Sequence, residues 1–159
     1  MVGQILKLEV VTEKKTLILL AEDNEGDVFL VRRALEKRGL PHELVVRHNG
    51  EEALAWLDDH SGEEDPTAAP DLILLDLNLP RIDGAQVLSH VRKTDAFTCT
   101  PVIVLTSSDS PRDREMALEL GANIYFRKPT DLASFMDLGR IIEELLKANP
   151  PLQLGQIAS

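Results

Sequence analysis

The chain has 159 residues, of which 43% are hydrophobic, and this suits one globular domain and excludes a disordered tail. Its 27 acidic and 17 basic side chains give a formal charge of −10, a surface that repels phosphate backbones, so we expect no nucleic-acid binding. Cys99 is the one cysteine, which excludes an intrachain disulfide, and no apolar run is long enough for a signal peptide or a membrane span; the sequence predicts a cytoplasmic protein.

The first expected element is the apolar run Thr16–Ala21, and similar runs recur along the chain. The segments that we predict to be strands are 16–21, 43–47, 72–75, 102–105 and 124–126. Runs such as LILL and VIVL are apolar at successive positions, which is typical of parallel strands covered by helices on both faces.

Helix signals fill the intervals between these runs. They are apolar residues at helical spacing, cap residues before the first turn, and glycine or proline after the last turn. The segments that carry them are 28–35, 49–57, 87–91, 110–121 and 131–146. The expected caps are Asn49, in a capping box with Glu52, then Ser110, and Thr130 for the last segment. Five strand–helix units in this order predict an α/β fold, a doubly wound parallel sheet with helices on both faces. We expect the domain to span 16–147, between an N-terminal extension, 1–15, and a C-terminal tail, 148–159.

Polar residues follow the predicted strands at the end where open α/β sheets bind ligands. Glu22 and Asp23 follow the first strand, Asp76 the third, Thr106 the fourth and Lys128 the fifth. If the first and third strands are neighbours, the three carboxylates meet in one small site. Two like charges about 4 Å apart repel by roughly 4 kcal/mol at an effective dielectric constant near 20. Mg²⁺, which prefers oxygen ligands, would balance them together with Lys128.

Two further acids nearby have a simpler explanation. Glu25 and Asp27 fall in the first turn of the predicted helix, where acidic residues interact favourably with the helix dipole and Asn24 can cap. We therefore assign them to the helix and not to the site. The four histidines and Cys99 are not at metal-ligand spacing, and no glycine-rich phosphate loop is present.

The ordered motifs resemble the receiver domain of two-component response regulators over about 16–147. The segments that carry the resemblance are Glu22-Asp23, LLDLNLPRIDG (74–84), Thr106-Ser107 and GANIYFRKP (121–129). The resemblance implies the flavodoxin-like strand order 2-1-3-4-5. It also implies that a sensor histidine kinase transfers a phosphoryl group to Asp76, and that the chain is a signalling protein that catalyses only its own phosphorylation and slow dephosphorylation.

The resemblance also assigns roles to the neighbouring residues. Asp23 and Asp76 would bind Mg²⁺ directly, with the backbone carbonyl of Asn78 as a further ligand and Glu22 acting largely through water. Thr106 and Lys128 would contact the phosphoryl group, and Tyr125 would follow Thr106 as the aromatic switch residue. The family usually has a cis peptide bond at the position of Lys128–Pro129.

A finer resemblance concerns the partner. EDNEGD and LGANIYFRKPTDL are similar to single-domain regulators that serve bacterial and cyanobacterial phytochrome kinases. The residues after Leu146 are too few for a DNA-binding module, so we expect output through protein contacts.

The last predicted helix has a wide apolar surface. We expect a core stripe there, widened by Leu138 and Ile141, and the surface is either fully buried or part of a homodimer interface. Tail residues Leu152, Leu154 and Ile157 could pack across such an interface. The expected stripe is Leu132, Phe135, Met136, Ile142, Leu145 and Leu146.

Two other functions use similar features. A Mg²⁺-dependent phosphatase of the haloacid dehalogenase type also has an Asp nucleophile after a parallel strand. Its nucleophile normally follows the first strand, and a second Asp stands where this chain has Asn78; turnover of p-nitrophenyl phosphate would identify it. A flavodoxin-like flavin carrier has the same strand order, but its first loop must bind phosphate, which Glu22 and Asp23 would repel; a colourless purified protein would exclude it.

Overall fold

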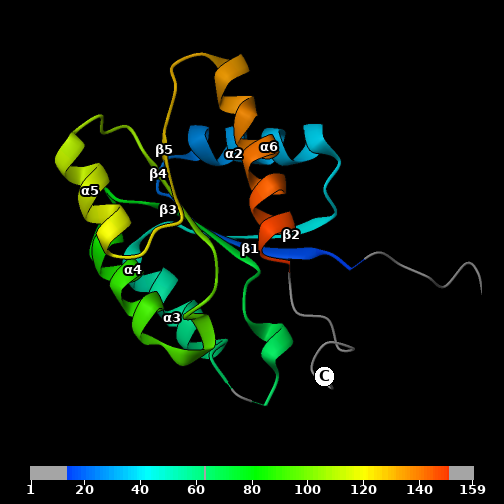
Figure 1. Cartoon of the computed structure of the whole chain (residues 1–159), viewed down its shortest axis with the longest axis vertical. Helices are drawn as coiled ribbons and strands as arrows, with labels where there is room; N and C mark the ends of the chain where they lie inside the picture. Colours follow the sequence, from blue (N-terminus) through cyan, green and yellow to red (C-terminus); the bar gives the residue numbers. More distant parts are fainter. Residues whose placement is uncertain (1–13, 63, 151–159) are drawn as a thin grey trace, which may run out of the picture.

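A computed structural model describes residues 14–62 and 64–150. Five parallel strands form one sheet in the order β2-β1-β3-β4-β5, which confirms the predicted fold and strand order (Figure 1). The strands are β1 (Thr16–Ala21), β2 (His42–Arg47), β3 (Leu72–Asp76), β4 (Val102–Thr106) and β5 (Ile124–Arg127). The structure therefore adds a polar or charged residue to the carboxyl end of three predicted strands, and these residues border the site described below.

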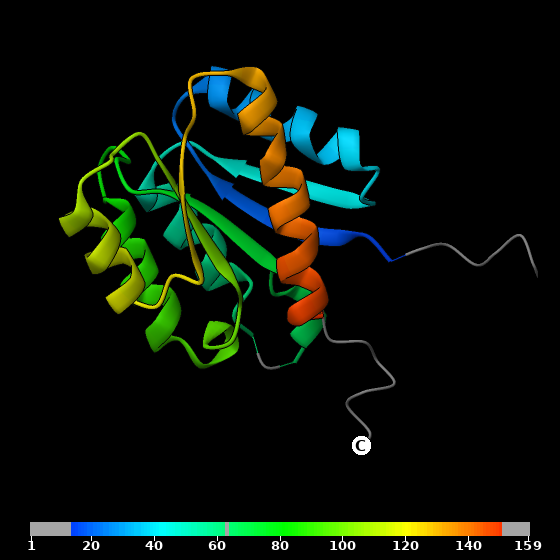
Figure 2. The same cartoon turned by 45° about the horizontal axis from the view of Figure 1, so that its top comes forward.

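Helices cover both faces of the sheet, with α2 and α6 on one face and α3, α4 and α5 on the other (Figures 1 and 2). Their bounds are α2 (Glu25–Arg38), α3 (Gly50–Asp59), α4 (Gly84–Lys93), α5 (Pro111–Glu119) and α6 (Leu132–Ala148), with short 3₁₀ turns η1 (Pro66–Ala68) and η2 (Asp95–Phe97). None of the helices in the described ranges combines the length and apolar content required to cross a membrane.

The alternation of side chains along the strands divides the core into two layers. Leu19, Ile73 and Val104 pack towards α3, α4 and α5, whereas Ile18 and Leu74 pack towards α2 and α6. Both sets are fully buried, because successive side chains of a strand point to opposite faces and each face is covered by helices. This explains why the central strands read as unbroken apolar runs.

The caps follow the sequence signals closely, with two differences. Asn24, Asn49 and Ser110 cap α2, α3 and α5 as expected. The expected cap Thr130 is wrong: Asp131 caps α6, because its carboxylate accepts a hydrogen bond from Ser134 N at 2.8 Å.

In α3 the carboxylate of Glu52 does not close a capping box onto the cap residue. It accepts instead from the backbone N of His48, at 3.3 Å, one residue before the cap Asn49.

The apolar surface of α6 also differs from the predicted stripe. Leu132, expected in the core, is 61% exposed, because it is the first residue of the helix and the buried face begins only at Phe135. Leu138, expected to widen the stripe, is fully buried at its centre. The residues of α6 that are buried are Phe135, Leu138, Gly139, Ile142 and Leu146, while Met136, Ile141 and Leu145 are half-buried. The tail residues Leu152, Leu154 and Ile157 lie outside the described residues.

Candidate functional site

The carboxyl ends of β1 and β3 place three acidic residues together. These strands are hydrogen-bonded neighbours, with Ala21 opposite Leu75, so the residues that follow β1 lie beside the last residue of β3. One carboxylate oxygen from each of Glu22, Asp23 and Asp76 lies within 4.8 Å of the others. Glu22 and Asp76 are buried, whereas Asp23 is exposed to solvent. Such a set of carboxylate oxygens suits a hard divalent cation such as Mg²⁺ or Mn²⁺ and does not suit softer metals.

Lys128 reaches this cluster from the end of β5, which is separated from β3 by β4. It directly follows β5, and its backbone N donates to Thr106 O at 2.8 Å, which fixes the start of its side chain next to β4. Its Nζ contacts Glu22 Oε2 at 2.8 Å and Asp76 Oδ2 at 3.0 Å, and only 8% of the side chain is exposed. The ammonium group therefore compensates part of the negative charge of two buried carboxylates.

The electrostatics of the cluster shift two pKa values upwards. Burial, and to a smaller extent the charge of the neighbouring Asp76, raise the pKa of Glu22 to about 7. The hydrogen bond with Lys128 acts in the opposite direction and lowers it. Burial alone would lower the pKa of Lys128, but its hydrogen bonds with Glu22 and Asp27 raise it overall. The lysine thus stays charged, and Glu22 is the carboxyl group that takes up a proton near neutral pH when no cation is bound.

Asp27 belongs to this arrangement, although its place in the sequence predicted only an interaction with the helix dipole. Its backbone N donates to the cap residue Asn24 at 3.0 Å, and its carboxylate accepts from Lys128 Nζ at 2.9 Å. Glu25, two residues earlier, does behave as expected of a surface residue: its side chain is 78% exposed and pairs with His48. Local spacing gave no signal for this contact, because Lys128 lies 101 residues later in the chain and follows β5.

The loop after Asp76 is held by close contacts with two helices. Asn78 N donates to Asp76 Oδ1 at 3.0 Å, which orients this carboxylate and places Asn78 beside it. A β-carbon on Gly84, the first residue of α4, would lie 2.1 Å from the backbone oxygen of Asp76, so only glycine permits this packing. Gly50, the first residue of α3, has the same role against Ile82. Arg81 adopts a φ of +68° at the tip of the loop.

A chain of hydrogen bonds leads from Thr106 to α5. Thr106 is fully buried, and its hydroxyl accepts from Ser108 N at 3.2 Å. The Ser108 hydroxyl donates to Asp113 in α5 at 2.6 Å, and the Ser108 carbonyl accepts from the Tyr125 hydroxyl at 2.9 Å. Tyr125 therefore lies half-buried against the loop that follows Thr106. A shift of Thr106 and Ser108 would change the hydrogen bonds of both Asp113 and Tyr125.

The expectation of a cis bond at Lys128–Pro129 is wrong for this structure, where the bond is trans. The trans form is intrinsically favoured by roughly 0.5–1 kcal/mol for bonds that precede proline.

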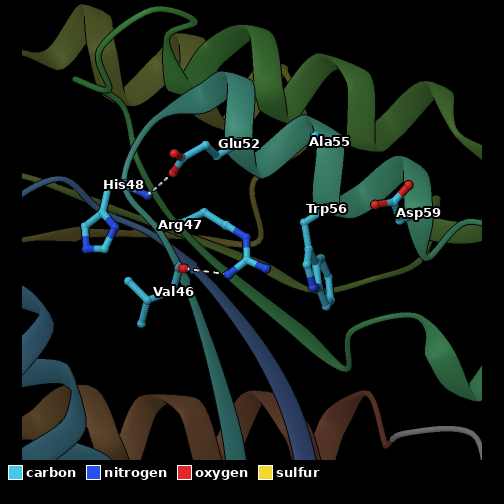
Figure 3. Close-up of a pocket in the computed structure, with 7 residues that line it drawn as sticks. All are labelled: Val46, Arg47, His48, Glu52, Ala55, Trp56 and Asp59. Carbon is cyan, nitrogen blue, oxygen red and sulfur yellow. Dashed lines mark hydrogen bonds between the residues drawn. The ribbon is translucent and has the colours of Figure 1, made fainter.

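A cavity of about 490 Å³ lies between β2 and α3 (Figure 3). Figure 3 shows the Arg47 guanidinium and the Trp56 ring projecting into this region from the strand and the helix. The residues that line it are Val46, Arg47, His48, Glu52, Ala55, Trp56 and Asp59, so none of the candidate site residues contributes to it.

Comparisons with known proteins identify relatives of the whole domain. A model of the family "response regulator receiver domain" matches residues 18–139. A probable methanogenesis regulatory protein, FilR2, from Methanothrix harundinacea is 38% identical over 84% of this chain and 83% of its own. Response regulator Rcp1 from Synechocystis is 37% identical over 80% of this chain and 86% of its own.

Solved structures of response regulators have a similar fold. The phosphorylated cyanobacterial phytochrome response regulator RcpA superimposes with a TM-score of 0.73 at 37% identity, over 82% of this chain and 93% of that one. The Mn²⁺-bound form of Rcp1 has a TM-score of 0.71 at 36% identity, over 81% of this chain and 92% of that one.

Proposed function

The chain belongs to the response regulator receiver domain family, and on that premise we propose that Asp76 accepts a phosphoryl group from a sensor histidine kinase. Receiver domains are signalling partners of such kinases and not classical enzymes. The proposal rests above all on one observation, the buried Asp76 carboxylate that shares an edge of the sheet with two further acids and the Lys128 ammonium. It assigns the domain to 16–147 and its output to protein contacts.

Each neighbour of Asp76 has a role in the proposed transfer. An oxygen of Asp76 attacks phosphorus, the bond from phosphorus to the donor nitrogen breaks, and the electron pair stays on the kinase histidine. Lys128 and the Thr106 hydroxyl would bind phosphoryl oxygens, and Asn78 N holds the other oxygen of Asp76. No general base is needed, since an ionised carboxylate is already a nucleophile. The protein would in this sense catalyse its own phosphorylation and slow dephosphorylation.

We propose Mg²⁺ as the physiological cation. Asp23, Asp76 and the backbone carbonyl of Asn78 would bind it, with Glu22 acting largely through water. Bound Mg²⁺ would neutralise charge on the transferred phosphoryl oxygens and align them. That a Mn²⁺-bound form of Rcp1 exists supports the binding of a divalent cation, and the carboxylate set of this chain is compatible with either ion.

The proposed response passes from Thr106 to Tyr125. Phosphorylation adds about one negative charge and new acceptor oxygens at Asp76. A phosphoryl oxygen that binds the Thr106 hydroxyl would draw the loop at Ser108 inward, and Tyr125, which donates to the Ser108 carbonyl, would follow. The surface of α5, β5 and α6 would then repack and contact a partner.

Three finer proposals concern the kinase, the oligomeric state and the cellular location. The likeness to RcpA, a phytochrome response regulator, supports a phytochrome-type kinase, which a phosphotransfer profile against the histidine kinases of the same organism would test. FilR2 is equally similar, so kinases that respond to other stimuli belong in that profile.

We also propose a homodimer through the region of α6, and a cytoplasmic location, where ATP-dependent kinases act.

The phosphoacceptor is tested with the variant Asp76→Asn. The native protein should take up a phosphoryl group from acetyl phosphate with Mg²⁺, and Asp76→Asn should take up none, because an amide is not a competent nucleophile at this position. Intact-protein mass spectrometry measures the uptake. The exposed Asp109→Asn, near the same edge of the sheet, is the matched control and should be labelled like the native protein. Labelling of Asp76→Asn to the native extent would refute the assignment.

A further inference from the structure

The Lys128 ammonium has no donor left for a new ligand. All three of its N–H groups are engaged by carboxylates, Glu22 at 2.8 Å, Asp27 at 2.9 Å and Asp76 at 3.0 Å. An incoming phosphoryl group therefore gains a hydrogen bond from Lys128 only if one of these carboxylates gives up its own. Which of them competes most strongly decides how firmly the lysine can hold the phosphoryl group.

Asp27 differs from the other two partners of Lys128. Glu22 and Asp76 belong to the group of oxygens that could bind a cation, whereas Asp27 does not. Asp27 comes from the first turn of α2, its cap Asn24 fixes its backbone, and 25% of its side chain is exposed. Bound Mg²⁺ would compensate the charge of the cation-binding carboxylates, but the charge of Asp27 would continue to act on the lysine.

On the premise of the proposed function, we propose that Asp27 is a positioning residue that holds Lys128 towards α2 and thereby weakens the binding of a phosphoryl group on Asp76. Its carboxylate opposes phosphorylation in two ways. It competes with the phosphoryl oxygens for the Nζ donors, and it repels the negative charge that the phosphoryl group adds. The same charge attracts a cation, so Asp27 must strengthen the binding of Mg²⁺ while it weakens that of the phosphoryl group.

These opposite signs provide the test. The variant Asp27→Asn keeps the shape of the side chain and an oxygen that can accept from Lys128, but removes the charge. At saturating Mg²⁺, beryllofluoride serves as the phosphoryl mimic, and calorimetry or ¹⁹F NMR gives its affinity. Removal of one charge a few ångströms away, in a medium between water and protein interior, should tighten beryllofluoride binding about three- to ten-fold and weaken Mg²⁺ binding about two- to five-fold. A variant that had merely lost structure would bind both ligands more weakly.

Glu25→Gln is the matched control. It removes the same formal charge from the same helical turn, but Glu25 is 78% exposed and pairs with His48 instead of Lys128. We expect both affinities to stay close to native in this variant, and Asp27→Glu to restore both towards native values.

A double-mutant cycle shows whether the effect passes through Lys128. In the Lys128→Gln background, Asp27→Asn should change beryllofluoride affinity by less than half of its effect in the native background. An equal effect would contradict the role of Lys128, and unchanged or weaker beryllofluoride binding by Asp27→Asn would overturn the inference as a whole. If the native protein itself bound no beryllofluoride and took up no phosphoryl group, the proposed function would fail instead.

Discussion

Glu22 is the residue whose protonation is most closely tied to the site. It is fully buried, its Oε1 accepts from Asn24 N at 3.1 Å, and its Oε2 accepts from Lys128. Even with these partners its pKa is raised to about 7, because burial penalises the ionised form more than the hydrogen bonds favour it. A group whose pKa is higher in the folded than in the unfolded chain stabilises the fold at low pH and loses that contribution as pH rises.

This predicts the pH dependence of stability without Mg²⁺. Between pH 4.5 and about 7, the free energy of unfolding of the native protein should fall relative to Glu22→Gln, because only the native protein must ionise a buried carboxyl group. The expected difference is on the order of 2 kcal/mol. Urea unfolding of both proteins at pH 5 and pH 8 measures it, with Glu119→Gln on the surface of α5 as the control. Parallel pH profiles for Glu22→Gln and the native protein would contradict the pKa assignment.

At the scale of elements, the loop between β3 and α4 is where packing controls the site. It lies between the first residues of α3 and α4, and Gly84 N donates to Leu77 O at 3.0 Å. Gly84 allows the helix to approach the backbone of Asp76 closely. The position of the proposed phosphoacceptor thus depends on backbone packing between elements and not only on the polar neighbours of its side chain.

Gly84→Ala should disturb that contact. The added β-carbon would lie 2.1 Å from Asp76 O, so α4 or the loop must move. We expect a loss of about 1–3 kcal/mol in the free energy of unfolding, as is usual for overpacking, together with slower phosphorylation by acetyl phosphate. Denaturant unfolding and the labelling assay measure the two effects. Gly62→Ala, where the added atom meets nothing within 4 Å, should change stability by less than about 0.5 kcal/mol.

The positions of the strands were predictable from the sequence, but their last residues and one contact of the site were not. The apolar runs located every strand, but their last residues were missed at Asp76, Thr106 and Arg127, because a polar residue at the end of a buried strand looks like a loop in a hydrophobicity pattern. The strand-end polar residues were predicted to meet because neighbouring parallel strands end at one edge. Asp27 was missed because its contact joins α2 to the residue after β5, and local spacing carries no information about that pair.

At the scale of the molecule, the two edges of the sheet are held differently. At the amino edge, the Arg92 guanidinium in α4 donates to the carbonyls of Phe97, Thr98, Thr100 and Gly121 and to Asn123 Oδ1. This joins α4 to the segments that precede β4 and β5. The carboxyl edge carries the acids, Lys128 and the Thr106–Ser108–Tyr125 chain of hydrogen bonds. We infer that a rearrangement on phosphorylation would be confined mainly to the carboxyl edge.

The proposed dimer is a property of the whole molecule. Leu132 in α6 is 61% exposed, and burial of a leucine side chain contributes about 1.5–3 kcal/mol. If α6 forms the proposed interface, light scattering of the native protein, with and without beryllofluoride, should show a dimer, and Leu132→Ser should weaken it about tenfold or more. Leu118→Ser in α5 is the control, being an exposed leucine outside α6. A strict monomer under both conditions would exclude the dimer.

The hydrogen bond from Tyr125 to Ser108 gives the molecule a native optical reporter. Tyr125 is the single tyrosine of the chain and Trp56 the single tryptophan. Trp56 stacks on His60, with ring centroids 3.9 Å apart, and lies beside β2, at the opposite end of the strand order from Tyr125 in β5. The ultraviolet absorption of the phenol is sensitive to the loss of its acceptor, while the indole belongs to a different part of the fold. The two chromophores thus separate events around Ser108 and Tyr125 from events near β2, without any attached label.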